Sequence, residues 1–379
     1  MKLVKKVFIK FLGSAANLFN LKFGLVNQSA LGHLIFDTEV NYLERGISRR
    51  TPRLLLFLLG STVNETITNF WREKLGANEN VFRLKIYSAM ASDNKYGKSI
   101  LNRELGAGDG SVLDESPPLF SFTKEQSILA HSLLGKLIKD KKKPIILFCL
   151  RDNAYYLERQ DYSNLNNHHH RNVDALNYLP SISFFLSKGF IVVRMGRVAE
   201  KKIQLDHEHF IDLPNNQEFM PGSIGIKNRE ILELALFEKS RFVVSTGLGL
   251  DAAATMFRKR VYLTDYYSTH NLYASKLFPF FLPKGYLDTM SGSLLAASDV
   301  FNGHYLSGQT AREFEDVNVS LVNCNSDQIL KFSSDIFNFE MKGETPGLSR
   351  VAKSHAEWLN NCHFKNRHIP IISNHWMNS

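Results

Sequence analysis

The chain has 379 residues, of which 44% are hydrophobic and 22% are charged, and its formal net charge is +9. This composition is typical of a globular protein with buried cores, excludes a disordered chain and, at this length, suggests two domains. The positive charge favours an anionic partner, and nucleic acid, nucleotide phosphates and anionic lipid all stay open on this ground.

Residues 1–20 are predicted to form a basic amphipathic helix. Apolar residues recur there at helical spacing, while Lys2, Lys5, Lys6 and Lys10 lie mostly off the apolar face. Such a helix can lie in a membrane interface, and the alternative is that it packs on the protein's own surface. We see no apolar run of membrane-spanning length, and the cleavage pattern of a signal peptide does not follow.

Residues 21–140 are predicted to form an N-terminal Rossmann-like domain. The apolar patterning predicts strands at 21–26, 53–59 and 81–87, and helices at 33–44, 64–75 and 123–139. The polar, glycine-rich stretch at 91–122 is expected to be an irregular insert. A lysine-rich break at 139–143 then places the domain boundary near residue 140.

Residues 141–340 alternate strands and helices more regularly. Strands are predicted at 145–150, 190–194, 210–213, 241–244 and 260–264, and helices at 173–187, 228–238, 252–257 and 326–337. This alternation predicts a doubly wound parallel sheet of the Rossmann type, in which ligands bind at the carboxyl ends of the strands. Residues 341–379 are expected to form a C-terminal helical tail.

The turn at 245–251 follows a predicted strand and leads into a helix of small residues. It contains Ser245, Thr246 and Gly247, and hydroxyls with a closely approaching backbone suit a phosphate at a helix N-terminus. Its spacing matches neither the dinucleotide-binding pattern nor a P-loop, which disfavours nicotinamide cofactors and classical ATP hydrolysis. The alternative is an ordinary turn in which Asp251 caps the helix.

Charged residues follow two other predicted strands. Arg194 and Gly196 end one of them, and an arginine there would face the ligand crevice and suit a diphosphate. Arg151 and Asp152 end another, where they either contact the substrate or form a salt bridge that orders the next loop. Arg171 begins a predicted helix and is a further candidate for binding an anion.

The N-terminal domain offers candidates for a catalytic base. His33 opens its first predicted helix and Asp37 lies one turn further on, so that either of them could deprotonate an acceptor hydroxyl. Glu39 is a rival carboxylate, and the alternative for a lone histidine is a structural role.

The histidines and cysteines do not follow a metal-binding pattern. The adjacent histidines at 168–170 and the histidines within 207–209 lack the spacing that lets side chains converge on one ion. Cys149, Cys324 and Cys362 are far apart, which indicates neither a zinc site nor a disulfide framework and fits a reducing compartment. No Asp-x-Asp motif at a strand end suggests a metal-bound nucleotide either, so we expect a protein that needs no metal, and we expect no cofactor.

Several of these segments together resemble a family of bacterial glycosyltransferases found with surface-polysaccharide genes. The resemblance runs from about residue 20 to 335 and is carried by Gly32-His33-Leu34, Phe148–Asp152 with Tyr155 and Tyr156, Arg171-Asn172-Val173 with Tyr178, Lys188–Gly196, Ile211-Asp212 and Arg241–Gly249. It implies a GT-B architecture, in which two Rossmann-like domains face each other across a cleft. The sequence departs from the family pattern at Asn228-Arg229-Glu230 and at 248–251.

The resemblance implies a cytoplasmic enzyme, and the basic helix predicted at 1–20 leaves open a location at the inner face of the cell membrane. It would move a sugar from a nucleotide-sugar donor to a glycan or a lipid-linked glycan, and it would not bind nucleic acid. The donor phosphates would contact Arg194, Gly196, Ser245, Thr246, Gly247 and Arg171, and the chemistry would involve His33, Asp37, Arg151 and Asp152. The alternatives are an epimerase or pyruvyl transferase on the same scaffold, and a non-catalytic basic protein that binds nucleic acid or membrane.

Overall fold

The computed structural model describes nine stretches of the chain, residues 21–46, 53–59, 61–75, 100–101, 108–268, 272–302, 310–347, 349–362 and 370–376. The chain divides into two compact units, Met1–Leu105 and Gly106–Ser379. This division falls earlier in the chain than the expected boundary near residue 140. The predicted basic helix at 1–20 and the predicted strand at 81–87 lie outside the described residues.

The first unit contains a parallel sheet in the order β2-β1-β3. Its elements are β1 (Leu21–Asn27), the π-helix η1 (His33–Asp37), α2 (Thr38–Gly46), β2 (Arg53–Leu59), α3 (Glu65–Leu75) and β3 (Ile100–Leu101). Leu34, Ile35, Val40, Ile67 and Trp71 are completely buried, which gives the helices their inward faces. The strands and helices predicted between residues 21 and 75 are confirmed.

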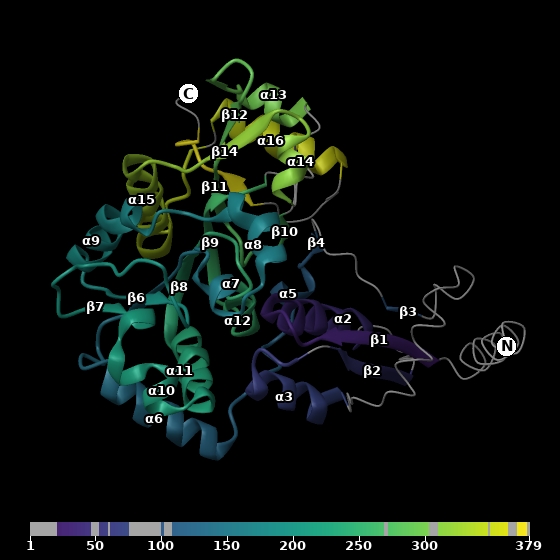
Figure 1. Ribbon diagram of the computed structural model, residues 1–379, viewed down its shortest axis with the longest axis vertical. Helices are drawn as coiled ribbons and strands as arrows, with labels where there is room; N and C mark the ends of the chain where they lie inside the picture. Colours follow the sequence, from purple (N-terminus) through teal and green to yellow (C-terminus); the bar gives the residue numbers. More distant parts are fainter. Residues whose placement is uncertain are drawn as a thin grey trace, which may run out of the picture. The chain divides into compact units, whose positions relative to one another are not determined.

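The second unit is built on a parallel sheet of seven strands in the order β15-β11-β9-β8-β5-β6-β7 (Figure 1). The strands are β5 (Ile145–Cys149), β6 (Ile191–Met195), β7 (Phe210–Asp212), β8 (Ser240–Ser245), β9 (Arg260–Tyr266), β11 (Phe280–Pro283) and β15 (Ile371–Ile372). Every residue of β5 and β6 is buried, as expected for parallel strands with both faces covered. The predicted parallel sheet is confirmed.

Helices cover both faces of this sheet. α9 (Leu179–Ser187) and α15 (Ser326–Lys342) lie on one side, and α6 (Lys124–Leu137), α10 (Pro221–Ile224) and α11 (Ile226–Lys239) on the other (Figure 1). Ala130 of α6 packs against Ile231 and Ala235 of α11 in a small apolar cluster. Because α6 buries its apolar face there, residues 108–140 belong to the second unit.

The remaining elements of the second unit are short. They are β4 (Gly108–Asp109), α5 (Val112–Glu115), α7 (Ala154–Glu158), α8 (Tyr162–His168), η3 (His169–Arg171), η4 (Ala175–Tyr178), η5 (Leu213–Asn215), η6 (Gln217–Phe219), α12 (Asp251–Met256), β10 (Tyr273–Ala274), β12 (Gly285–Asp288), β13 (Ser293–Leu294), α13 (Ala297–Asn302), α14 (Ala311–Glu315), β14 (Val319–Val322) and α16 (Arg350–Cys362). The expected helical tail contains α16, and it also supplies β15 to the edge of the main sheet.

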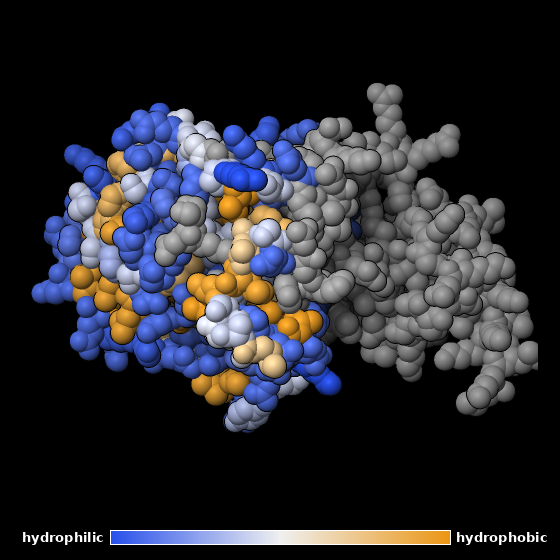
Figure 2. All heavy atoms as spheres, turned by 90° about the horizontal axis from the view of Figure 1, so that it is seen from above, coloured by the Kyte–Doolittle hydropathy of each residue, from blue (hydrophilic) through white to orange (hydrophobic). Residues whose placement is uncertain are grey.

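The described part of the chain has no helix that is long and apolar enough to cross a membrane. The coloured part of the face in Figure 2 mixes hydrophobic and hydrophilic residues. Such a mixture is ordinary for a water-exposed surface, so hydrophobicity does not point to a binding surface there.

Candidate functional site

The carboxyl ends of β5, β6 and β8 lie side by side. Cys149, the last residue of β5, is paired with Met195 of β6 and with Ser245 of β8. Because the three strands are parallel neighbours, the residues that follow them meet at one edge of the sheet. This edge therefore brings together most of the site residues that the sequence predicted in the second unit.

The turn after β8 satisfies its own polar groups. The carboxylate of Asp251 accepts hydrogen bonds from the Ser245 hydroxyl and from the backbone N–H of Leu248, the latter at 3.0 Å. The N–H of Gly247 donates to the Ser245 hydroxyl at 3.2 Å. Burial raises the pKa of Asp251 to about 7. The hydroxyl and N–H donors that would bind a phosphate therefore already have acceptors within the turn. This geometry favours the alternative, a structural turn.

Gly247 is required by packing. Its backbone has a φ of +77°, and a Cβ placed on it would lie 2.4 Å from the Tyr266 ring. The ring of Tyr266 is itself buried. The glycine thus makes room for a tyrosine of β9, and this explains its presence in the turn without a ligand.

Thr246 connects the ends of β8 and β5. Its hydroxyl oxygen accepts a hydrogen bond from the backbone N–H of Arg151 at 3.0 Å, and its own N–H donates to the carbonyl of Cys149 at 3.0 Å. The Thr246 side chain is completely buried. It therefore fixes the backbone on which Arg151 stands, and it is not placed to contact a ligand directly.

Arg194 does not have the position that the sequence suggested. Only 1% of its side chain is exposed, and its Nη1 donates to the carbonyl of Lys201 at 2.7 Å. Its two Nη atoms each lie 3.5 Å from a carboxylate, one from Asp212 and one from Asp152. The expected contact with a diphosphate is corrected accordingly: the guanidinium is enclosed by protein carboxylates, which neutralise its charge.

The two carboxylates around Arg194 also hold the following loop. Asp152 accepts the N–H of Glu200 at 3.0 Å, and Asp212 accepts the N–H of Ile203 at 2.9 Å. Asp152 is thus part of a network that orders a loop, which is the structural alternative weighed for it from the sequence.

Gly196 takes part in a second buried network. It has a φ of +135°, and its carbonyl accepts a hydrogen bond from Nη2 of Arg229 at 2.5 Å. Arg229 is buried, and it also contacts Glu233 at 2.7 Å and the carbonyl of Phe219 at 2.7 Å. Sequence reasoning missed this arginine, because its partners are spread over three segments of the chain.

Arg151 and Arg171 are half-buried arginines near this edge. The guanidinium of Arg171 lies 3.7 Å from the centre of the Tyr267 ring, and that of Arg151 donates to the Tyr156 hydroxyl at 3.0 Å. Within the described part of the chain, neither guanidinium pairs with a carboxylate, and neither Nε has a hydrogen-bond partner. Burial and then the charge of Arg171 lower the pKa of Arg151, while Tyr156 opposes this shift. Two neighbouring cations without a counter-ion favour an anionic ligand.

The segment that carries Arg171 is held in place by buried groups. Lys284 is 1% exposed, and its Nζ donates to the carbonyl of Asn172 at 2.7 Å and to the Asn323 side chain. The N–H of Val173 donates to the carbonyl of Arg151 at 3.0 Å. These bonds fix the backbone next to both arginines.

His33 and Asp37 form a pair in the first unit. Nδ1 of His33 lies 2.8 Å from Oδ2 of Asp37, and 36% of the histidine side chain is exposed. A carboxylate in this position orients the imidazole and leaves the other ring nitrogen to accept a proton. The two candidates that the sequence left as rivals are therefore partners, while Glu39 is completely buried.

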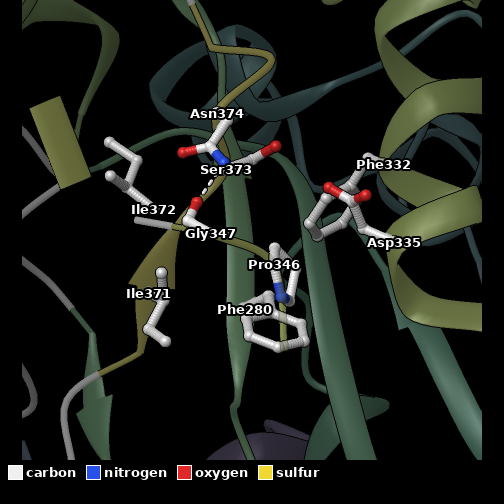
Figure 3. A pocket seen from close by; sticks show the side chains of 9 residues that line it. All are labelled: Phe280, Phe332, Asp335, Pro346, Gly347, Ile371, Ile372, Ser373 and Asn374. Carbon is white, nitrogen blue, oxygen red and sulfur yellow. Dashed lines mark hydrogen bonds between the residues drawn. The ribbon is translucent and has the colours of Figure 1, made fainter. Parts of the chain in front are cut away.

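A small hollow lies between α15, β11 and β15 (Figure 3). Its lining is mostly apolar, with Phe280, Phe332 and Ile372 among the residues, and its charged group is the carboxylate of Asp335. A hollow with a carboxylate and without a basic residue is unsuited to a phosphate. The described residues also contain no group of three or more histidine, cysteine, aspartate or glutamate side chains that could hold a metal ion.

Comparisons with known proteins add little to this description. The sequence matches no protein-family model and no curated protein. The family 9 glycosyl transferase of Veillonella parvula is similar with a TM-score of 0.42 and 9% identity, over 83% of this chain and 96% of that one. The Escherichia coli ADP-heptose LPS heptosyltransferase II gives 0.32 and 12%, over 64% and 84%. Staphylococcus aureus MnaA, solved with UDP, gives 0.22 and 10%, over 91% and 84%. Such scores carry no argument about function.

The packing of Gly247 predicts a large effect of a single methyl group. We expect Gly247→Ala to lower the free energy of unfolding by about 3 kcal/mol, from left-handed backbone strain together with overpacking. Gly189→Ala is the matched control, because Gly189 has a φ of +85° and open space around it. It should lose only about 1 kcal/mol in the same denaturant titration. Equal losses for the two variants would show that the contact with Tyr266 is not important.

The enclosure of Arg194 predicts a stability effect. We expect Arg194→Ala to lower the free energy of unfolding by about 3 kcal/mol, because it leaves two carboxylates without their cation. Amide hydrogen exchange in residues 197–203 should become faster. Arg312→Ala, at an arginine side chain that is 84% exposed, should leave both quantities nearly unchanged. A stable Arg194→Ala variant with unchanged exchange would contradict this interpretation.

Proposed function

We propose that this protein is a glycosyltransferase that binds the diphosphate of a nucleotide-sugar donor through Arg151 and Arg171. The observation that supports this is a pair of neighbouring guanidinium groups without a carboxylate partner in the described residues, at the carboxyl end of β5. In doubly wound sheets, ligands bind outside the carboxyl ends of the strands. Guanidinium groups bind phosphate oxygens through paired, charge-assisted hydrogen bonds.

The proposed reaction is one in which the two arginines stabilise the negative charge of a leaving diphosphate. The oxygen of an acceptor hydroxyl would attack the anomeric carbon of the donor sugar, and the bond from that carbon to the diphosphate would break. The electron pair of this bond leaves with the diphosphate, whose growing charge Arg151 and Arg171 would stabilise. In this way the arginines would supply positive charge that a metal ion supplies in other transferases.

A transfer with inversion also needs a base for the acceptor proton. We assign this role to the second ring nitrogen of His33, with Asp37 orienting the ring through Nδ1. The acceptor class, a surface glycan or lipid-linked glycan, and the cytoplasmic location follow only from the family resemblance.

Donor binding tests the role of the arginines. In calorimetry with a panel of UDP-, GDP-, CMP- and dTDP-sugars, we expect one donor to bind the parent protein. Arg171→Ala should weaken it at least tenfold, the effect of losing about 1.5–3 kcal/mol from a charged hydrogen bond. Arg159→Ala is the matched control, because Arg159 stacks 5.3 Å from the Tyr155 ring, just as Arg151 does with Tyr156. The proposal fails if no donor binds, or if both variants bind equally well.

Turnover tests the role of the histidine. We expect His33→Gln to reduce the release of nucleoside diphosphate from the donor about a hundredfold or more, because a general base contributes on this scale. Asp37→Asn should reduce it less, and neither change should alter the affinity for the donor. Release is measured with water or a glycan fraction as acceptor. Turnover by His33→Gln at the parent's rate would exclude His33 as the base.

A further inference from the structure

His170 lies beside Arg171 and has no assigned role. Its ring centroid is 5.8 Å from that of Tyr267 and 5.4 Å from that of Phe314. Tyr267 is also the ring over which Arg171 stacks, so the imidazole and the guanidinium share one aromatic neighbour. This places His170 next to the proposed phosphate contacts.

The ring of His170 lacks hydrogen-bond partners. Both of its nitrogens are covered, and neither bonds to another group in the described part of the chain. A buried polar atom without a partner costs about 1–3 kcal/mol, so two such atoms on one ring call for an explanation. A ligand with several acceptor oxygens would provide the missing partners.

The charges that lower the pKa of His170 belong to basic groups. Arg171, His168 and His169 come from its own segment, and Lys284 lies between β11 and β12. The helix α14, whose Phe314 packs against the ring, also carries Arg312, Glu313 and Glu315, and all three are exposed. Burial, followed by the charge of Arg171, lowers the pKa of His170 to about 3. The ring is therefore neutral near pH 7 while the site holds no anion, because a further positive charge there would be repelled.

We propose that His170 is the third contact to the bound phosphate group and that it takes up one proton from solvent as the anion binds. This inference rests on the proposed function, since it concerns the same donor site. The negative charge of the ligand would offset the surrounding cations and favour the imidazolium. The protonated ring would then donate to phosphate oxygens from its two nitrogens. Because both nitrogens are covered in this structure, the ring must turn when the anion enters.

The direction of the pH effect follows from this change. Binding takes up protons in the range between the pKa of His170 in the free protein, about 3, and its higher pKa in the complex. In that range, affinity falls as the pH rises, and above it affinity no longer depends on His170. If the bound pKa returns to the ordinary value of about 6.5, most of the uptake is measurable at pH 6.0.

Calorimetry with inorganic pyrophosphate at pH 6.0, in two buffers of different ionisation enthalpy, counts the protons. We expect the parent protein to take up about 0.7 proton more than His170→Gln, with about tenfold tighter binding. Titration of the ligand itself cancels in this difference. His169→Gln is the matched control, because that ring is exposed and bonds to the carbonyl of Asn166 at 2.8 Å. It should behave like the parent.

The histidine signals of the parent protein give a second measurement that needs no folded variant at position 170. In NMR titrations, one histidine should change from a very low pKa to a near-ordinary one when pyrophosphate is added. Equal proton uptake by parent and His170→Gln, or no such histidine, would overturn the inference. Pyrophosphate binding with proton uptake but without nucleotide-sugar binding would support His170 and refute the glycosyltransferase. Nucleotide-sugar binding without proton uptake would refute the role of His170 and support the glycosyltransferase.

Discussion

The carboxyl edge of a parallel sheet gathers polar groups that must find partners, and this constraint shapes the site. In this protein, β6 and β8 satisfy the requirement internally. Arg194 lies between Asp152 and Asp212, and the turn after β8 bonds to Asp251. Arg151, which follows β5, differs from these groups, because its guanidinium has no carboxylate partner among the described residues and Arg171 is also nearby. The proposed binding of a phosphate group at this edge rests on that difference.

Residues outside the β5 end fix the backbone near Arg151 and Arg171. Thr246 holds the N–H of Arg151, and Lys284 holds the backbone next to Arg171. The backbone that carries the two arginines is therefore held by groups outside their own segments. A preorganised site of this kind gains electrostatic stabilisation of a charged ligand without reorganising when the charge arrives. In the proposed site, the buried groups at the neighbouring strand ends would contribute to binding without touching the ligand.

The first unit carries a different kind of preorganisation. His33 and Asp37 are four residues apart, and the π-helical turn brings their side chains to 2.8 Å. π-Helical turns are rare and often occur at functional sites. The pair fixes the ring orientation of a partly exposed histidine, which a base needs in order to accept a proton from one direction.

The sequence by itself determined the parallel sheet, the order of its helices and strands, and the fact that charged residues follow the strands. The spacing of apolar residues and the positions of glycines predict these features, because each depends on residues close together in the chain. Only the tertiary structure decided which arginine is available to a ligand. Arg194 is neutralised by carboxylates 18 and 42 positions away in the chain, and Arg171 faces an aromatic ring instead. Whether a guanidinium pairs with a carboxylate depends on residues distant in the chain. The sequence around the end of one strand does not indicate which residues these are.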